Sequence, residues 1–250
     1  MTAVELDAWY VYGVVSAGAK APDGVTLVER GPVAAAVAPV SLSDFGEDAL
    51  AAHLNDRDWL EQHAREHEDV LRRVAASTNV VPFRFGAIYR DRADVESLLD
   101  ARRDELVAAL ERVRGRIELG VKVWADRARI EAAADDAAPA STGRAYLERR
   151  LEQQDRAQRI SSLLADTART VHARLLAHAI EGVANRPQPR ELTGREEPMI
   201  LNGAYLVPVD DDSFGGEVGA LRAEHADDGI TVELTGPWPP YNFVASEVSE

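Results

Sequence analysis

The segment Gly229–Val244, GITVELTGPWPPYNFV, decides how the end of the chain is built. Its first half alternates apolar and polar residues, and this period of two predicts a strand with one buried face. Gly236 and Pro237 are expected to end that strand, because proline has no N–H to donate to a neighbouring strand.

The second half of this segment combines prolines with large aromatic residues. Prolines hold the backbone extended, and Trp238, Tyr241 and Phe243 offer large apolar faces. Disordered tails are poor in aromatic residues. We therefore predict a structural motif, a rigid arm docked on the body of the protein, with Trp238 as its main anchor. The alternative is a loose proline-rich tail.

The first half of the chain shows the patterns of several strands and two amphipathic helices. Strands are expected at Trp9–Val15, Val25–Glu29, Val33–Val40, Val80–Ile88 and Arg116–Trp124, and helices near 60–74 and 91–115. This order predicts a ferredoxin-like, mostly antiparallel sheet with its helices on one face. The other face would then be free for a protein partner, with Tyr10 and Tyr12 projecting from it.

The second half predicts another α+β unit. Its features are a long helix over Tyr146–Glu181, a strand over Met199–Val209, a short helix, and the final strand with its docked arm. The stretch between the halves is small, acidic and interrupted by Pro139. The predicted organisation is a domain over 1–126, a mobile linker over 127–143 and a second domain over 144–250.

Composition narrows the possible partners. The formal net charge is −15 and 46% of the residues are hydrophobic. An acidic surface argues against nucleic acid or an anionic membrane as the main partner. The absence of cysteine excludes disulfides and thiolate chemistry. No apolar run approaches the ~20 residues of a membrane span, and the chain start does not resemble a signal peptide. We expect a cytoplasmic protein.

Several residues have the type or spacing of functional sites. His63 and His67 stand four apart, as zinc ligands on a helix do, but the Glu of a metalloprotease motif is misplaced. We predict a structural pair, with His67 bonded to backbone or a carboxylate. Arg84, between two phenylalanines, is expected to be either a functional cation or a structural arginine stacked on the rings. The acidic run Asp210–Asp212 lacks the rest of a calcium loop.

No phosphate loop, dinucleotide fingerprint or nucleophile elbow accompanies these residues. No cofactor, metal site or catalytic residue is therefore predicted. The residues themselves indicate a binding or assembly protein without an enzymatic function.

Four motifs together resemble one known family. These motifs are YVYGVV near the start, His67 ahead of VVPFRFGAIY, LNGAYLVPV, and GPWPPYNFV at the end. In this order they look like the gas vesicle accessory proteins of the GvpF/GvpL family. The resemblance implies a non-enzymatic protein of gas vesicle formation, located at the gas vesicle. It also implies a partner, the hydrophobic shell protein GvpA, which such proteins are held to keep from aggregating or to assist in nucleation and assembly. Other gas vesicle accessory proteins are further expected partners.

Two other hypotheses stay open at this point. One is a small-ligand-binding regulatory module of ferredoxin-like type, with its site on the sheet face or between the units. The other is a metal-dependent hydrolase that uses His63, His67 and a carboxylate.

Overall fold

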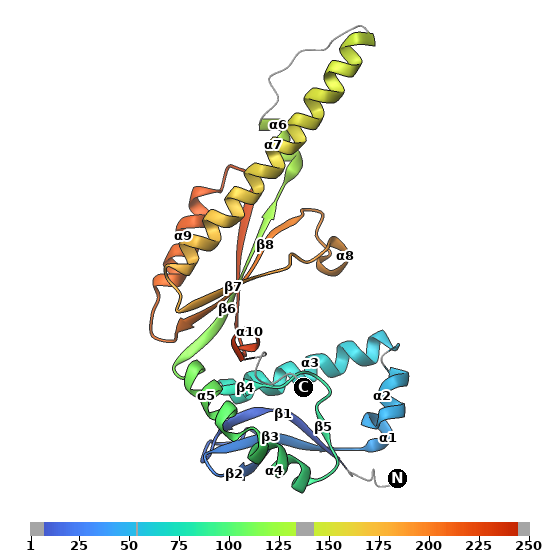
Figure 1. The fold of residues 1–250 in the computed structure, drawn as a ribbon, viewed down its shortest axis with the longest axis vertical. Coiled ribbons are helices and arrows are strands. Elements are labelled where there is room, and N and C mark those ends of the chain that lie inside the picture. Colours follow the sequence, from blue (N-terminus) through green and yellow to red (C-terminus); the bar gives the residue numbers. More distant parts are fainter. Residues whose placement is uncertain (1–7, 54, 134–142, 245–250) are drawn as a thin grey trace. The chain divides into compact units, whose positions relative to one another are not determined.

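The computed structural model describes residues 8–53, 55–133 and 143–244 (Figure 1). These residues form two antiparallel sheets with helices and divide into two compact units. Of the described residues, the first unit holds 8–118 and 238–244, and the second holds 119–237. The predicted α+β class with two units is confirmed.

The first unit contains one sheet in the order β2-β3-β1-β4, with β5 also paired to β1. Its strands are β1 (Ala8–Ser16), β2 (Thr26–Arg30), β3 (Val33–Val40), β4 (Val80–Pro82) and β5 (Ile88–Tyr89). Its helices are α1 (Leu42–Phe45), α2 (Glu47–His53), α3 (Arg57–Ala75), α4 (Arg92–Ala101), α5 (Arg103–Val113) and α10 (Tyr241–Val244).

Local sequence signals explain the start and the buried face of α3. The Asp56 carboxylate accepts hydrogen bonds from the N–H groups of Asp58 and Trp59, both at 3.1 Å, which caps the helix. The predicted apolar stripe is the buried face of this helix, with Leu71 and Val74 at its centre. Asp91 caps α4 in the same way, through the N–H of Asp94.

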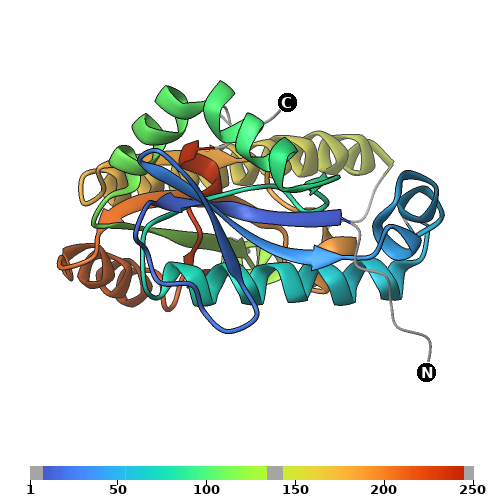
Figure 2. The same ribbon diagram turned by 90° about the horizontal axis from the view of Figure 1, so that it is seen from below.

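Helices cover both faces of the first sheet. Figure 2 shows α3 on one side of the strands and α4 and α5 on the other. Val15, Ala34 and Ala36 pack with α3, whereas the opposite face of the strands packs with α4 and α5. The predicted arrangement with helices on one face is therefore wrong. β1 is buried on both faces, so its pattern did not show which face a helix covers.

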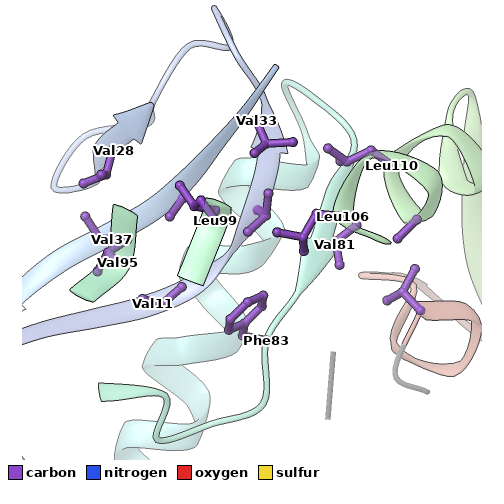
Figure 3. Close-up of a cluster of buried hydrophobic side chains, with 14 of the residues drawn as sticks. Val11, Val28, Val33, Val37, Val81, Phe83, Val95, Leu99, Leu106 and Leu110 are labelled. Atoms are coloured by element: carbon purple, nitrogen blue, oxygen red, sulfur yellow. The ribbon is translucent and has the colours of Figure 1, made fainter. Parts of the chain in front are cut away.

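The larger core of the first unit lies between the sheet and α4 and α5 (Figure 3). Figure 3 shows Val11, Val28 and Val37 from the strands facing Val95 and Leu99 from α4. Leu106 and Leu110 of α5 close the same core beside Val81 and Phe83, and Val244 of α10 also packs against it. Val244, the last described residue, therefore belongs to the same core as the first strands of the chain.

The second unit contains a sheet in the order β7-β8-β6-β9. Its strands are β6 (Arg116–Ala125), β7 (Glu181–Asn185), β8 (Met199–Pro208) and β9 (Ile230–Trp238). Its helices are α6 (Arg127–Ala133), α7 (Gly143–Leu176), α8 (Arg190–Thr193) and α9 (Ser213–Glu224). Val171 and Leu175 of α7 and Phe214 of α9 are buried, which identifies the inner faces of these helices.

The structure corrects three boundaries. β6 was predicted in the first sheet but pairs in the second, because an alternating strand carries no signal for its partner. Unit 2 therefore begins near Leu119, and the chain returns to unit 1 at Trp238, so the predicted domains 1–126 and 144–250 are misplaced. β9 also continues through Pro237, as an edge strand can.

The predicted linker over 127–143 lies only partly within the described residues. Residues 127–133 form α6, and 143 begins α7, whereas 134–142 lie outside the described residues. Mobility of this segment stays a prediction. In the part of the chain that the structure describes, no helix is both long enough and apolar enough to span a bilayer.

Candidate functional site

Three elements of the first unit meet around the imidazole of His67. Tyr10 lies on β1, His67 on α3 and Tyr241 at the start of α10. Nδ1 of His67 is 2.8 Å from the Tyr10 hydroxyl, and Nε2 is 3.0 Å from the Tyr241 hydroxyl and 3.2 Å from the Phe83 carbonyl oxygen. Tyr10 and His67 are each only 3% exposed. The imidazole therefore joins three segments that are distant in sequence.

The hydrogen bonds of the neighbouring groups determine which nitrogen of this imidazole carries the proton. The Gly86 N–H donates to the Tyr10 oxygen at 3.0 Å, which leaves the Tyr10 O–H to donate to Nδ1 of His67. The Tyr241 O–H donates to the Glu68 carboxylate at 2.9 Å, so its oxygen accepts from Nε2–H. His67 is thus a neutral imidazole with its proton on Nε2.

Burial also favours the neutral form. It lowers the pKa of His67 from 6.5 to about 4, although the hydrogen bond to the Phe83 carbonyl opposes this change. Both ring nitrogens have partners, so neither is available to hold a metal or to move a proton on a substrate. The predicted hydrogen bond of His67 to the backbone is present, and its acceptor is the Phe83 carbonyl oxygen. Among the described residues, no three potential metal ligands gather at one place.

The buried carboxylate of Glu118 is a second group that binds the terminal arm, through Asn242. The Glu118 side chain is buried on β6, and its two oxygens accept from the Asn242 N–H at 3.0 Å and from Asn242 Nδ2 at 2.6 Å. Burial raises the pKa of Glu118 from 4.5 to about 7, the Asn242 bonds oppose that rise, and the Glu68 charge adds to it.

These two groups predict opposite pH dependences. A raised carboxyl pKa means that the folded state holds the Glu118 proton more tightly, so its contribution to stability is lost as the pH rises from 4.5 to about 7. The lowered pKa of His67 acts in the other direction, because its contribution is lost as the pH falls from 6.5 to about 4.

The Glu118→Gln variant lacks the titrating carboxyl group, so its comparison with the wild type separates the effect of Glu118 from that of His67. The stability of the wild type relative to this variant is expected to fall by on the order of 1–2 kcal/mol between about pH 5.5 and 8. Urea unfolding of both proteins at the two pH values measures this difference. A difference that does not change with pH would show that Glu118 keeps an ordinary pKa.

The arm is anchored by residues other than the predicted one. Trp238 is 42% exposed, whereas Phe243 is 3% exposed and Val244 is completely buried. The prediction of Trp238 as the anchor is therefore wrong. Tyr241 and Phe243 contact the body of the first unit, and Trp238 stays at the surface because β9 continues to it before the chain turns inward.

The other predicted site residues take different positions. Tyr10 is buried and does not project from a free face. The prediction that it is exposed to a protein partner is therefore wrong. Tyr12 is half-buried and lines a groove that is open to solvent, together with Val70 and Arg73. Arg84 is exposed, and the ring contacts of the described residues do not include it. The stacked arginine is Arg195, 4.6 Å from the Trp124 ring centroid.

The second predicted histidine belongs to an aromatic stack that sequence reasoning missed. The Trp59 ring lies between His53 and His63, with centroid distances of 4.4 and 4.0 Å. Nδ1 of His63 is 2.8 Å from the Trp59 carbonyl oxygen, one helical turn earlier. The spacing of four between Trp59 and His63 was the available signal, because such residues share a helix face.

The exposed apolar side chains are the remaining surface feature of interest. Most of the large ones lie in the second unit, and in the described residues they are Leu42, Leu163, Leu176, Ile180, Leu192, Val209 and Trp238. Single exposed apolar residues are ordinary, but groups of them indicate contact surfaces.

Comparison with known proteins adds the family. The family model for "Gas vesicle synthesis protein GvpL/GvpF" matches residues 8–245. The chain belongs to the GvpL/GvpF family. Gas vesicle protein L of Streptomyces sp. (strain CB03234) is 35% identical over 240 residues, which cover 92% of this chain and 88% of that protein. Gas vesicle protein F2 of Halobacterium salinarum (strain ATCC 700922 / JCM 11081 / NRC-1) is 29% identical, with coverages of 94% and 91%.

Solved GvpF structures share the fold of this GvpL/GvpF protein. The crystal structure of GvpF from Anabaena sp. PCC7120 matches with a TM-score of 0.66 at 18% identity and covers 95% of both chains. GvpF from Microcystis aeruginosa matches with a TM-score of 0.64 at 20% identity, covering 95% of this chain and 99% of the other. The predicted family is confirmed, and with it a role in gas vesicle formation.

Proposed function

We propose that this GvpL/GvpF protein binds the gas vesicle shell protein GvpA at the gas vesicle and keeps it from aggregating or assists its nucleation and assembly, without catalysis. The observation that carries the proposal is the exposed indole of Trp238, held at the surface of a chain with a net charge of −15. Tryptophan is enriched among the residues that dominate protein interfaces.

The local structure presents this indole in a fixed place. Trp238 ends β9, and the buried residues Pro239 and Pro240 follow it directly. Phe243 then fixes the arm in the first unit. An apolar side chain on a fixed support loses little conformational entropy when it binds a partner.

The acidic surface supports the same function in another way. A shell subunit outside its assembly is expected to expose apolar surface, and exposed apolar surface promotes aggregation. A strongly acidic partner that covers such surface keeps the complex dispersed by charge repulsion. The neutral, fully bonded His67 also supports a role without catalysis, because it offers no free nitrogen.

The alternative of a small-ligand module has less structural support. One of its two predicted sites was the free face of the first sheet, which α3 covers. The groove beside Tyr12 is open to solvent, and four of the eight residues that line it are charged, unlike the predominantly apolar pockets that bind small ligands.

Trp238→Ala tests the proposal with the full chain. The variant is expected to bind immobilised GvpA at least about tenfold more weakly than the wild type. It should also lose the ability to suppress light scattering when denatured GvpA is diluted into buffer. Binding of the wild type should persist toward molar salt, because apolar contacts are not screened.

Leu192→Ala is the matched control, since Leu192 is the most exposed of the large apolar side chains in the described residues. Its binding to GvpA should equal that of the wild type. Failure of the wild type to bind GvpA would refute the proposed function, and equal binding by the Trp238 variant would refute the role of the indole.

A further inference from the structure

Three exposed apolar side chains occur close together at one end of the second unit. Leu176 is the last residue of α7, Ile180 precedes β7 and Val209 follows β8. They are 41%, 48% and 54% exposed, respectively. We call Leu176, Ile180 and Val209 the apolar patch.

Backbone pairing brings the segments of the apolar patch side by side. The Ile180 N–H donates to the Leu206 carbonyl at 2.9 Å, three residues before Val209. Leu176 lies over the next strand, since a Cβ on Gly182 would be 3.1 Å from Leu176 Cδ1. Figure 1 shows the end of α7, the start of β7 and the end of β8 at the same end of the unit.

Carboxylates border the apolar patch. Asp210, Asp211 and Asp212 are exposed and follow Val209 directly. Asp211 accepts from the Ser213 N–H at 2.8 Å, while the side chains of Asp210 and Asp212 form no ion pair with any described residue. The border therefore carries negative charge that no neighbour in the described chain neutralises.

The nearest basic residues already have carboxylate partners. Arg174, two residues before Leu176 on α7, forms ion pairs with Glu217 at 2.6 Å and with Glu224. His178 lies 3.9 Å from the same Glu217 carboxylate and also interacts with Asp211. The surroundings of the patch therefore remain acidic.

We propose that the apolar patch is a docking surface for a protein segment whose apolar side chains are flanked by lysine or arginine, such as a basic amphipathic helix. Burial of Leu176, Ile180 and Val209 supplies the apolar part of the contact. Asp210 and Asp212 select the basic flanks and repel segments with acidic flanks. This surface belongs to the second unit, whereas Trp238 belongs to the first. The proposed contact goes beyond shell-protein binding, because it depends on charge.

The test uses the full chain and a labelled amphipathic peptide of leucine and lysine, about four helical turns long. Fluorescence anisotropy measures its affinity for the wild type and for the double variant Ile180→Ser, Val209→Ser. The double variant should bind at least about tenfold more weakly, the loss expected for removing two partly buried apolar contacts. Asp210→Asn with Asp212→Asn should bind more weakly at low salt, and this difference should disappear near molar salt.

Two controls make the test specific. Leu163→Ser with Leu192→Ser removes two exposed leucines elsewhere in the same unit and should bind the peptide as the wild type does. A peptide with glutamate in place of lysine should not bind the wild type. Thermal unfolding establishes that every variant is folded.

Equal losses in the patch variant and the leucine control would overturn the proposal, because the peptide would then bind the acidic surface without a preferred place. Binding of the glutamate peptide as tight as that of the lysine peptide would overturn the selection of basic flanks. A loss confined to the patch variants would support both parts.

Discussion

Phe243→Ala is expected to destabilise the protein by about 3–5 kcal/mol, the usual range for removing a large buried aromatic side chain. Phe243 is almost completely buried, and Val244 beside it packs against the core between the first sheet and α4 and α5. The truncation leaves a cavity that rigid neighbours fill only in part. Urea unfolding of the full chain, followed by circular dichroism, measures the loss.

Trp238→Ala is the control in the same arm. Trp238 is partly exposed, so its truncation is expected to cost only about 1 kcal/mol. A loss from Trp238→Ala that equals or exceeds the loss from Phe243→Ala would restore Trp238 as the anchor.

His67→Leu has the second largest expected effect, about 2–4 kcal/mol of destabilisation. Leucine nearly fills the space of imidazole but leaves the Phe83 carbonyl without its donor and the Tyr10 hydroxyl without its acceptor. A buried polar group that loses its partner costs about 1–3 kcal/mol. The free energy of unfolding at neutral pH measures the effect.

His63→Leu is the matched control on the same helix. His63 is half-buried and bonds only to the backbone of Trp59 in the contacts described above. Its replacement is expected to cost about 1 kcal/mol or less. Similar losses for the two variants would mean that the Tyr10–His67–Tyr241 contacts add nothing beyond packing.

Local patterns in the sequence predicted the elements with strong periodicity. The apolar stripe of α3 and the start of a helix near residue 91 both follow from rules that act within a few residues. The aromatic residues among the prolines at the end also indicated that the arm docks on the body. These features depend on near neighbours, which a single sequence displays.

Features that depend on distant partners were not predictable in this way. β6 alternates cleanly, and such a strand fits either sheet equally well. Glu118 is buried because Asn242, far along the chain, supplies two donors to its carboxylate. No spacing rule joins these two residues. Trp238 shows the same limit, because an aromatic residue between prolines suits a buried anchor and an exposed contact equally.

The division of the chain also sets the order in which its parts can be completed. The first unit holds residues on both sides of the second unit in the sequence, and Phe243 and Val244, which fill its core, are synthesised after every residue of the second unit. Domains generally fold in the order of their synthesis. Here the inserted second unit has all of its strands before the first unit receives its final side chains. During translation, the first unit therefore waits with an unfilled apolar site, and the second unit is completed before it.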